Sequence, residues 1–252
     1  MLTSRRRNEI LTRLKREGQI VAKTLSRELG LSEDTIRRDL RDLAEEGLLQ
    51  RVHGGALPVS SAVAGFAVRL GVASAEKSAI GKAAASLVRT GQIVFVDGGT
   101  TAVQLARHLP HDIRATVLTH SPSVAVQLVE HPGLEVGVIG GRLFKHSIVT
   151  VGAETMEAIA RVRPDIYFMG VTGIHADVGL TTGDLEEAAV KRALCKNAAE
   201  TVVLASSEKL GAASPYIIVP LCDVDRIVVA GAVPKNLQAQ LIEAKIEIVR
   251  AS

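Results

Sequence analysis

A glycine-rich turn near residue 100 has the residue types that bind a phosphate group. Gly98-Gly99-Thr100-Thr101 follows an apolar run over residues 93–97 and precedes an amphipathic stretch with helical spacing. Glycines let the backbone approach a ligand closely, and the first amides of a helix, with its dipole, favour an anion. Threonine hydroxyls add hydrogen-bond donors. A tight connection between a strand and a helix has the same composition, so the turn alone leaves both interpretations open.

Charged residues elsewhere in the sequence fit a phosphate at this turn. Asp97 precedes the turn, where its charge would repel a phosphate, so we expect it to accept hydrogen bonds from sugar hydroxyls or to orient the turn. Lys191 and Lys209 can each supply a counter-charge, although a single lysine is more often a surface residue.

Small and polar residues follow several other apolar runs. Ligands of parallel α/β sheets bind in the crevice at the carboxyl ends of the strands, so we expect these residues to line the same crevice. They are Thr119, His120, Ser121, Gly140, Gly141 and residues 170–173.

The N-terminal quarter carries a second set of reactive side chains, arginines on one face of a predicted helix. Residues 20–39 have the spacing of a helix-turn-helix, with a short helix, a turn at 30–32 and a longer helix. Arginine reads guanine edges, and arginine and threonine contact phosphates. Double-stranded DNA is therefore the predicted partner. The predicted contacts are Ser32, Thr35, Arg37, Arg38 and Arg41, with Arg51 and His53 from a following wing.

A three-helix module for protein interactions is the alternative that this spacing leaves open. In that module the arginines would pair with Asp39, Asp42 and Glu45.

Three short helices and a hairpin must position the arginines. Apolar spacing predicts a first helix capped by Thr3 or Ser4 and stopped by Gly18. A second helix over 21–29 should bury Val21, Leu25 and Leu29 and end at Gly30. A third, capped by Ser32, should bury Ile36, Leu40 and Leu43 and stop at Gly47. Residues 48–59 read as a hairpin with its turn at 53–55.

The rest of the chain reads as a separate unit. Residues 58–75 are rich in small residues and are interpreted as a linker between a domain at 1–57 and one at 76–252. Seven apolar runs in the second domain alternate with helical patterns, which predicts a mostly parallel sheet covered on both faces. The runs lie at 93–97, 115–120, 134–140, 165–170, 201–206, 226–231 and 246–250.

The distribution of charge separates the two units. The formal net charge is +3, and residues 1–57 hold all of the excess, while the remainder is balanced. This favours a polyanion partner for the first unit, although a solvated basic helix face gives the same pattern. No apolar stretch is long enough to span a bilayer, so we expect no membrane contact and a cytoplasmic location.

The motifs resemble one family of bacterial regulators. The stretch from Arg6 to Pro58 is similar to the DNA-binding domain of the DeoR family, on RRNEIL at 6–11, LSEDTIRRDLRDLAEEGLL at 31–49 and RVHGGAL at 51–57. The resemblance covers nearly the whole chain. The later matching stretches are EKSAIGKAAA at 76–85, DGGTT at 97–101, GGRL at 140–143, GLTTGDLEEAAVKRAL at 179–194 and SSEKLG at 206–211.

The resemblance implies the fold class and a function. It implies an N-terminal winged helix-turn-helix followed by a larger, mostly parallel-sheet α/β domain that resembles ribose-phosphate isomerases. It also implies a repressor of carbohydrate-metabolism genes that a phosphorylated sugar releases from operator DNA. The family usually has Asn in place of His120 and Asp in place of Ala205. These departures are expected to alter which effector binds and to leave the phosphate turn intact.

Two other functions compete with this one. An isomerase fused to a DNA-binding head needs a carboxylate base, and Asp97, Asp184, Glu186 and Glu187 are available, although the last three more simply begin a helix. An architectural DNA-binding protein needs no ligand, which the glycine turns at successive strand ends argue against. We expect no catalytic residue, metal or cofactor, and a homo-oligomer, a dimer or tetramer, because helix-turn-helix proteins usually bind paired half-sites.

Overall fold

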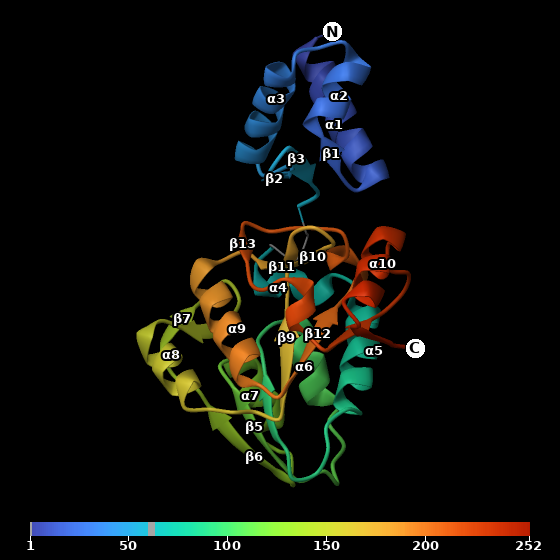
Figure 1. Ribbon diagram of the computed structural model, residues 1–252. Coiled ribbons are helices and arrows are strands. Elements are labelled where there is room, and N and C mark those ends of the chain that lie inside the picture. Colours follow the sequence, from blue (N-terminus) through green and yellow to red (C-terminus); the bar gives the residue numbers. More distant parts are fainter. Residues whose placement is uncertain (1, 60–63) are drawn as a thin grey trace.

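The computed structural model describes residues 2–59 and 64–252 as a small helical head and a larger α/β body (Figure 1). The head comprises residues 2–57 and the body residues 72–252; residues 64–71 lie between them in the chain. Each has its own hydrophobic core, and the head core is built by residues such as Ile10, Leu25 and Leu40.

Three helices form most of the head: α1 (Thr3–Glu17), α2 (Ala22–Leu29) and α3 (Glu33–Glu45). Gly30 ends α2 in the left-handed region at φ 63°, where a side chain would be strained, as the sequence predicted. The predicted cap of α1 is wrong: Leu2 occupies the N-cap and makes no side-chain cap, and Thr3 and Ser4 are already helical. The Ile36, Leu40 and Leu43 stripe is confirmed as buried.

A three-stranded sheet completes the head. Strands β2 (Gln50–Val52) and β3 (Gly55–Leu57) form the predicted hairpin. A third strand, β1 (Ile20–Val21), pairs antiparallel with β3 and gives the order β1-β3-β2. Val21 is therefore a strand residue and 48% exposed, so its predicted place in the helical core is wrong.

The segment between head and body contains regular structure. Helix α4 (Phe66–Gly71) and the first two residues of α5 (Ser74–Ala85) fall within the predicted linker at 58–75. Part of the predicted linker is therefore helical, since its small residues conceal a short helix, and the role of residues 58–75 as a linker stays a prediction. Residues 60–63 of that prediction lie outside the described residues.

A seven-stranded parallel sheet forms the centre of the body, in the order β15-β14-β12-β9-β4-β5-β6. All seven predicted apolar runs are confirmed as its strands. They are β4 (Ile93–Val96), β5 (Ala115–Thr119), β6 (Leu134–Val138), β9 (Ile166–Gly170), β12 (Glu200–Ala205), β14 (Arg226–Val229) and β15 (Glu247–Arg250).

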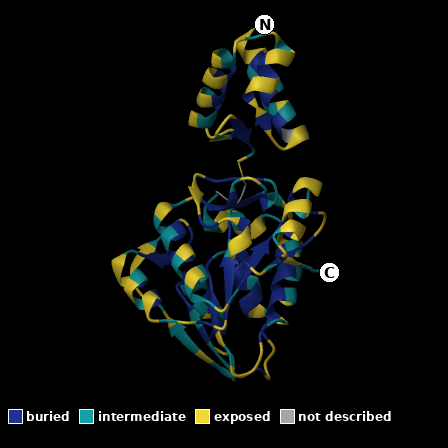
Figure 2. Ribbon diagram, viewed as in Figure 1, coloured by how far each residue is buried: buried dark blue, intermediate teal, exposed yellow. Residues whose placement is uncertain are grey.

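Helices cover both faces of this sheet. Alternate residues of each strand enter different cores: Val94 and Val96 join the core under α5, α6 (Thr100–Arg107) and α7 (Pro122–Leu128). Phe95 enters the other core, under α8 (Ala153–Ala160), α9 (Leu185–Asn197) and α10 (Lys235–Glu243). Figure 2 shows the buried sheet between helices whose outer faces are exposed.

Short antiparallel strands, which the sequence did not predict, lie near the carboxyl ends of the parallel strands. A hairpin joins β7 (Arg142–Phe144) to β8 (Val149–Val151). A second small sheet has the order β10 (Gly173–His175), β11 (Gly179–Thr182) and β13 (Tyr216–Ile217). Two single-turn 3-10 helices, η2 (Ser207–Lys209) and η3 (Leu221–Asp223), complete the body.

Candidate functional site

The third helix of the head presents a row of exposed arginines. Ser32 caps α3, since its Oγ accepts a hydrogen bond from the Thr35 amide at 3.2 Å, and this cap fixes where the helix begins. Arg38 and Arg41 are exposed and form no ion pair within the described part of the chain. Arg37 is exposed and pairs with Glu33 one turn earlier, at 2.7 Å.

The wing extends this basic surface. Arg51 and His53 are exposed on the hairpin. Together with Arg37 they line one open hollow between α3 and the wing. Three of the predicted DNA contacts are therefore brought together, and the other four lie on α3 or at its N-cap. A recognition helix beside a wing is the arrangement that binds a major groove.

Another arginine has a structural role in the head. Arg6 on α1 pairs with the buried Asp39 of α3, and its Nη2 donates to Asp39 Oδ1 at 2.9 Å. The carboxylate raises the pKa of Arg6, chiefly through this hydrogen bond. Asp39 thus binds α1 and leaves the arginines of α3 unpaired with it, against the interaction-module alternative.

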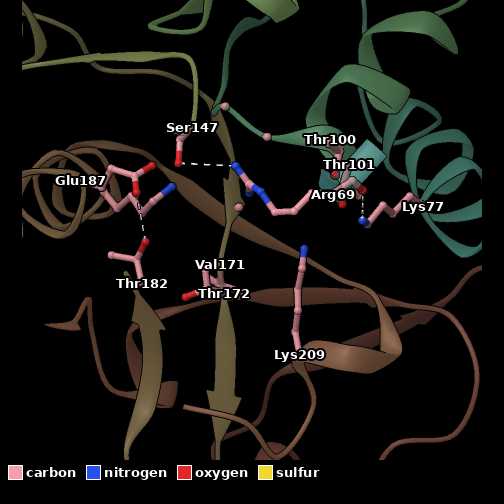
Figure 3. A pocket seen from close by; sticks show the side chains of 14 residues that line it. Arg69, Lys77, Thr100, Thr101, Ser147, Val171, Thr172, Thr182, Glu187 and Lys209 are labelled. Atoms are coloured by element: carbon pink, nitrogen blue, oxygen red, sulfur yellow. Dashed lines mark hydrogen bonds between the residues drawn. The ribbon is translucent and has the colours of Figure 1, made fainter. Parts of the chain in front are cut away.

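A pocket in the body lies at the carboxyl ends of the parallel strands and is open to solvent; the space of about 480 Å³ between its lining residues includes open solvent (Figure 3). Basic, hydroxyl and glycine residues dominate its wall. The lining residues are Arg69, Lys77, Gly98, Gly99, Thr100, Thr101, Ser147, Gly170, Val171, Thr172, Thr182, Glu187, Lys191 and Lys209.

The glycine turn forms one wall of this cavity at the start of α6. Gly99 is the N-cap of α6 with φ 108°, a conformation that other residues rarely adopt. A Cβ on Gly98 would overlap the side chain of Val149. Gly98 is therefore required by close packing and Gly99 by its backbone conformation. The turn precedes the first amides of α6, which favour an anion.

Asp97 lies behind the turn and is completely buried. Its Oδ1 accepts hydrogen bonds from the Gly98 amide at 2.7 Å and from His120 Nε2 at 2.8 Å. Its Oδ2 accepts from the Gly170 amide at 2.8 Å, from the Tyr167 hydroxyl at 3.2 Å and from the ammonium group of Lys191. With five donors in place, Asp97 orients the turn and does not face the ligand space.

Opposing effects set the ionisation of Asp97. Burial raises the pKa of its carboxyl. The charge of Lys191 and the hydrogen bond from His120 lower that pKa by more than burial raises it, so the pKa lies well below the usual value. His120 Nδ1 also meets the carbonyl oxygen of Thr150, at 2.8 Å. Both ring nitrogens of His120 are therefore held in place, one by Asp97 Oδ1 and the other by the carbonyl oxygen of Thr150.

Three further cations face the cavity, all with depressed pKa values. Burial lowers the pKa of Lys209 to about 8, against the opposing attraction of Glu208. Burial likewise lowers the pKa of Lys77, whose Nζ lies 3.8 Å from Glu208 Oε1. Arg69 is half-buried, and burial lowers its pKa. Such desolvated cations gain most from an anion.

Two lining groups lack a hydrogen-bond partner in the described structure. They are Arg69 Nε and Thr101 Oγ1, both fully buried atoms. Buried donors in native proteins are normally paired, so an unpaired pair of donors beside one cavity indicates that an acceptor binds there.

The carboxylates that an isomerase could use as a base are differently placed. Asp184 caps α9 by accepting from the amides of Glu186 and Glu187, each at 3.0 Å. Glu186 pairs with Arg142. Glu187 is buried, lines the cavity and meets the Thr182 hydroxyl at 3.4 Å.

Two family models match the chain in sequence. Residues 6–62 match the DeoR-like helix-turn-helix domain, and residues 72–230 match the DeoR C terminal sensor domain. The chain belongs to the DeoR family. The body is therefore a DeoR sensor domain, and the protein is a DNA-binding transcriptional regulator, as the sequence predicted.

Relatives of this DeoR-family protein match it almost end to end. The HTH-type transcriptional regulator GlpR of Haloferax volcanii is 32% identical over 253 residues, which cover 99% of this chain and 98% of the relative. The HTH-type transcriptional repressor GlcR of Bacillus subtilis is 34% identical over 87% of this chain and 85% of its own. The glycerol-3-phosphate regulon repressor of Escherichia coli is 28% identical over 98% and 99%.

Solved structures resemble part of the chain. Ribose 5-phosphate isomerase A of Methanocaldococcus jannaschii gives a TM-score of 0.40 at 18% identity over 53% of both chains. The eIF2B beta subunit of Chaetomium thermophilum gives 0.45 at 15% identity over 61% of this chain and 48% of its own.

The predicted ligand contacts of the DeoR sensor domain divide into two groups. Gly98 to Thr101, Lys191 and Lys209 line the cavity, whereas Asp97, Thr119, His120, Ser121, Gly140 and Gly141 do not. The β7–β8 hairpin covers the end of β5: Ser121 Oγ donates to the carbonyl of Ile148, and His120 contacts Thr150. Gly140 lies beside α8, where its carbonyl accepts from Thr155 Oγ1 at 2.8 Å.

Sequence reasoning missed several lining residues. Arg69 falls in the predicted linker, and Lys77 falls in the EKSAIGKAAA stretch that was used for the family resemblance and not for the site. The pairing of Lys77 with Glu208 could have drawn attention to Lys77 only with the fold in hand, because the two residues lie far apart in the sequence.

Two searches of the described residues bear on other functions. They contain no group of three or more metal-ligating side chains, and no helix among them is both long and apolar enough to cross a membrane.

Proposed function

We propose that this DeoR-family protein represses carbohydrate-metabolism genes and that a phosphorylated sugar in the sensor cavity releases it from its operator. The observation that carries the proposal is the cavity wall. It combines the glycine turn at a helix start with four cationic side chains and two unpaired donors. A phosphate gains several charge-assisted hydrogen bonds there, each worth about 1.5–3 kcal/mol, which a neutral sugar lacks.

The opposite side of the cavity suits the sugar part of the effector. Glu187, Thr182 and Thr172 line that side, and Glu187 meets the Thr182 hydroxyl there (Figure 3). A buried carboxylate accepts hydrogen bonds from hydroxyl groups, so this side fixes the orientation of a polyol chain whose phosphate lies at the turn. The name of the Escherichia coli relative, a glycerol-3-phosphate regulon repressor, supports a phosphorylated polyol as the class of effector.

The cavity acts as a sensor in this proposal and not as an active site. Asp97, which follows a parallel strand as a catalytic base would, has all its acceptor positions occupied. Turnover assays on pentose and hexose phosphates test this part, and isomerisation of any of them would support the enzyme alternative. We further propose a homo-oligomer, because each head carries a single recognition helix and paired half-sites require two.

A thermal-shift screen tests the proposal directly. The full-length protein is heated with pairs of phosphorylated and free sugars, and with glycerol 3-phosphate and glycerol. We expect at least one phosphorylated compound to raise the melting temperature while its free partner does not. Complexes with operator DNA are then titrated with the same compounds. Stabilisation by free sugars alone would contradict the proposal.

A further inference from the structure

Arg69 connects the sensor cavity to the segment that leads to the head. It lies on α4, the short helix between head and body in the sequence, and its guanidinium extends into the cavity (Figure 3). Its Nη2 is 3.5 Å from Ser147 Oγ, which is a long hydrogen bond. Its Nε is buried without a partner. The guanidinium is therefore placed for an acceptor that the protein does not itself provide.

Helix α4 is weakly attached to the rest of the body. It has six residues and none of them is buried; Val68 and Leu70 are 64% and 46% exposed. A helix this short is not stable alone in water. Phe66 anchors one end, packing partly against the core, and its amide donates to the carbonyl of His146 at 3.0 Å. The other anchor is the cavity side of the helix.

Lys77 provides that second anchor. Its Nζ donates to the carbonyl oxygen of Arg69 at 2.8 Å, so the same lysine that faces the cavity also holds α4. An anion in the cavity would attract the ammonium group of Lys77 and the guanidinium of Arg69 together. Occupancy of the cavity would thus change the two contacts that hold this end of α4: the bond from Lys77 Nζ to the Arg69 carbonyl, and the long bond from Arg69 to Ser147.

We propose that Arg69 binds the phosphate of the effector directly and that α4 transmits occupancy of the cavity to the head. This inference rests on the proposed function, because it requires an anionic effector in the cavity. The effector supplies the missing acceptor of Arg69 Nε and fixes α4 against the turn at Gly98 and Gly99. The chain segment that joins α4 to the head is then attached to a fixed helix when the effector is bound and to a loosely held helix when it is not.

Hydrogen exchange with inorganic phosphate as the probe tests this inference in the full-length protein. In the wild type we expect phosphate to slow amide exchange both in α4 and in the turn at 98–101. In Arg69→Gln we expect phosphate affinity to fall about tenfold or more, the loss of one charge-assisted contact. At saturating phosphate this variant should still show protection of the turn but none of α4. Leu70→Ala, on the exposed side of the same helix, is the matched control and should behave as wild type.

Operator affinity supplies the second measurement. With sodium chloride replaced by phosphate at constant ionic strength, we expect weaker operator binding for the wild type and Leu70→Ala but not for Arg69→Gln. Equal protection of α4 in wild type and Arg69→Gln would overturn the role of Arg69. Protection of the turn without α4, or protection of both without an effect on DNA, would overturn transmission and leave the proposed function standing. No response of either region to phosphate, with no hit in the sugar screen, would overturn both.

Discussion

The head and the sensor cavity both present cations for an anion, but in contrasting environments. On the head, Arg38 and Arg41 are exposed on α3, so their charges are solvated. In the cavity, Lys77 is 3% and Lys209 6% exposed, and burial depresses the pKa of each. The first set is solvated in the absence of a ligand, whereas the second has lost much of its hydration already.

The difference in burial predicts that affinity for DNA at the head and affinity for a small anion in the cavity depend on different physical terms. Exposed charges interact through a high dielectric, and salt screens them, so DNA affinity must be built from many weak contacts. Buried charges interact strongly over a few contacts, so a small ligand can bind with useful affinity. The two sites should therefore respond differently to salt, substitution and pH.

Salt should separate the two sites most. A protein with six to ten phosphate contacts loses about 10³–10⁵ in DNA affinity between about 50 and 200 mM salt. We expect operator affinity to fall on that scale, while affinity for a phosphorylated effector falls much less. Filter binding or fluorescence anisotropy for DNA and calorimetry for the effector measure both. Equal salt dependence at the two sites would break the comparison.

A negative charge in the cavity should remove only the response to effector. Thr101→Glu places a carboxylate at the glycine turn, where we propose that the phosphate binds, and we expect effector affinity to fall about 100-fold or more, because a contact becomes a like-charge repulsion. Operator binding should persist, since the head has its own core. Gln240→Glu, at an exposed site on α10, is the control. Normal release of the Thr101→Glu variant by effector would place the sensor site elsewhere.

Removal of an arginine side chain from the recognition helix should weaken operator binding and leave effector binding unchanged. Arg38→Ala should weaken operator binding by about 1–3 kcal/mol if Arg38 contacts a base, and should weaken all DNA alike if it contacts a phosphate. Arg37→Ala tests the neighbouring position, where pairing with Glu33 must be broken first. Operator and random DNA are compared at fixed salt, with the body variant Arg89→Ala as the control. Unchanged binding by both folded variants would refute the recognition-helix assignment.

The pH dependence of effector binding should be the smallest of these effects. The pKa of Lys209 is lowered to about 8. The lysine is therefore charged at pH 7 and loses its proton as the pH rises through the pKa of about 8. Effector affinity should fall about tenfold per pH unit above it, the slope for one bound proton. Calorimetry between pH 7 and pH 9 measures this. Lys209→Met should bind weakly with a flatter profile; an unaltered slope in this variant would assign the titration to another group.

The parallel sheet could be predicted from the sequence, because its strands are buried on both faces and so read as continuous apolar runs. The short antiparallel strands could not. β7, β8 and β10 have three residues each, too few to show an alternation of apolar and polar residues. Their conformation depends on packing against the rest of the body. α4 was missed for a related reason: it has no buried residue and thus no apolar stripe.

The candidate site was half predictable. The glycine turn and the two lysines were identified from their residue types, as an anion site at a helix start and its counter-charges. The rule that ligands lie at the carboxyl ends of strands identified residues 170–172, which also line the cavity. It failed at His120 and Ser121, because the rule does not say which strand ends are covered, and the β7–β8 hairpin covers β5. It could not find Arg69, which comes from no strand of the sheet and enters the cavity from a helix outside it.

The hydrogen bonds of Asp97 have a mechanical consequence. Through Gly98, His120, Tyr167 with Gly170, and Lys191, this carboxylate joins the ends of β4, β5 and β9 to helix α9. These four elements form one stiff block, since moving any of them breaks a buried charge-assisted bond. Within the described residues, neither α4 nor η2 is bonded to Asp97. One side of the cavity, formed by the block around Asp97, is therefore rigid, and the other side, formed by α4 and η2, can move when a ligand binds. The displacement it causes falls on the deformable side, which includes the helix that precedes the sensor domain in the chain.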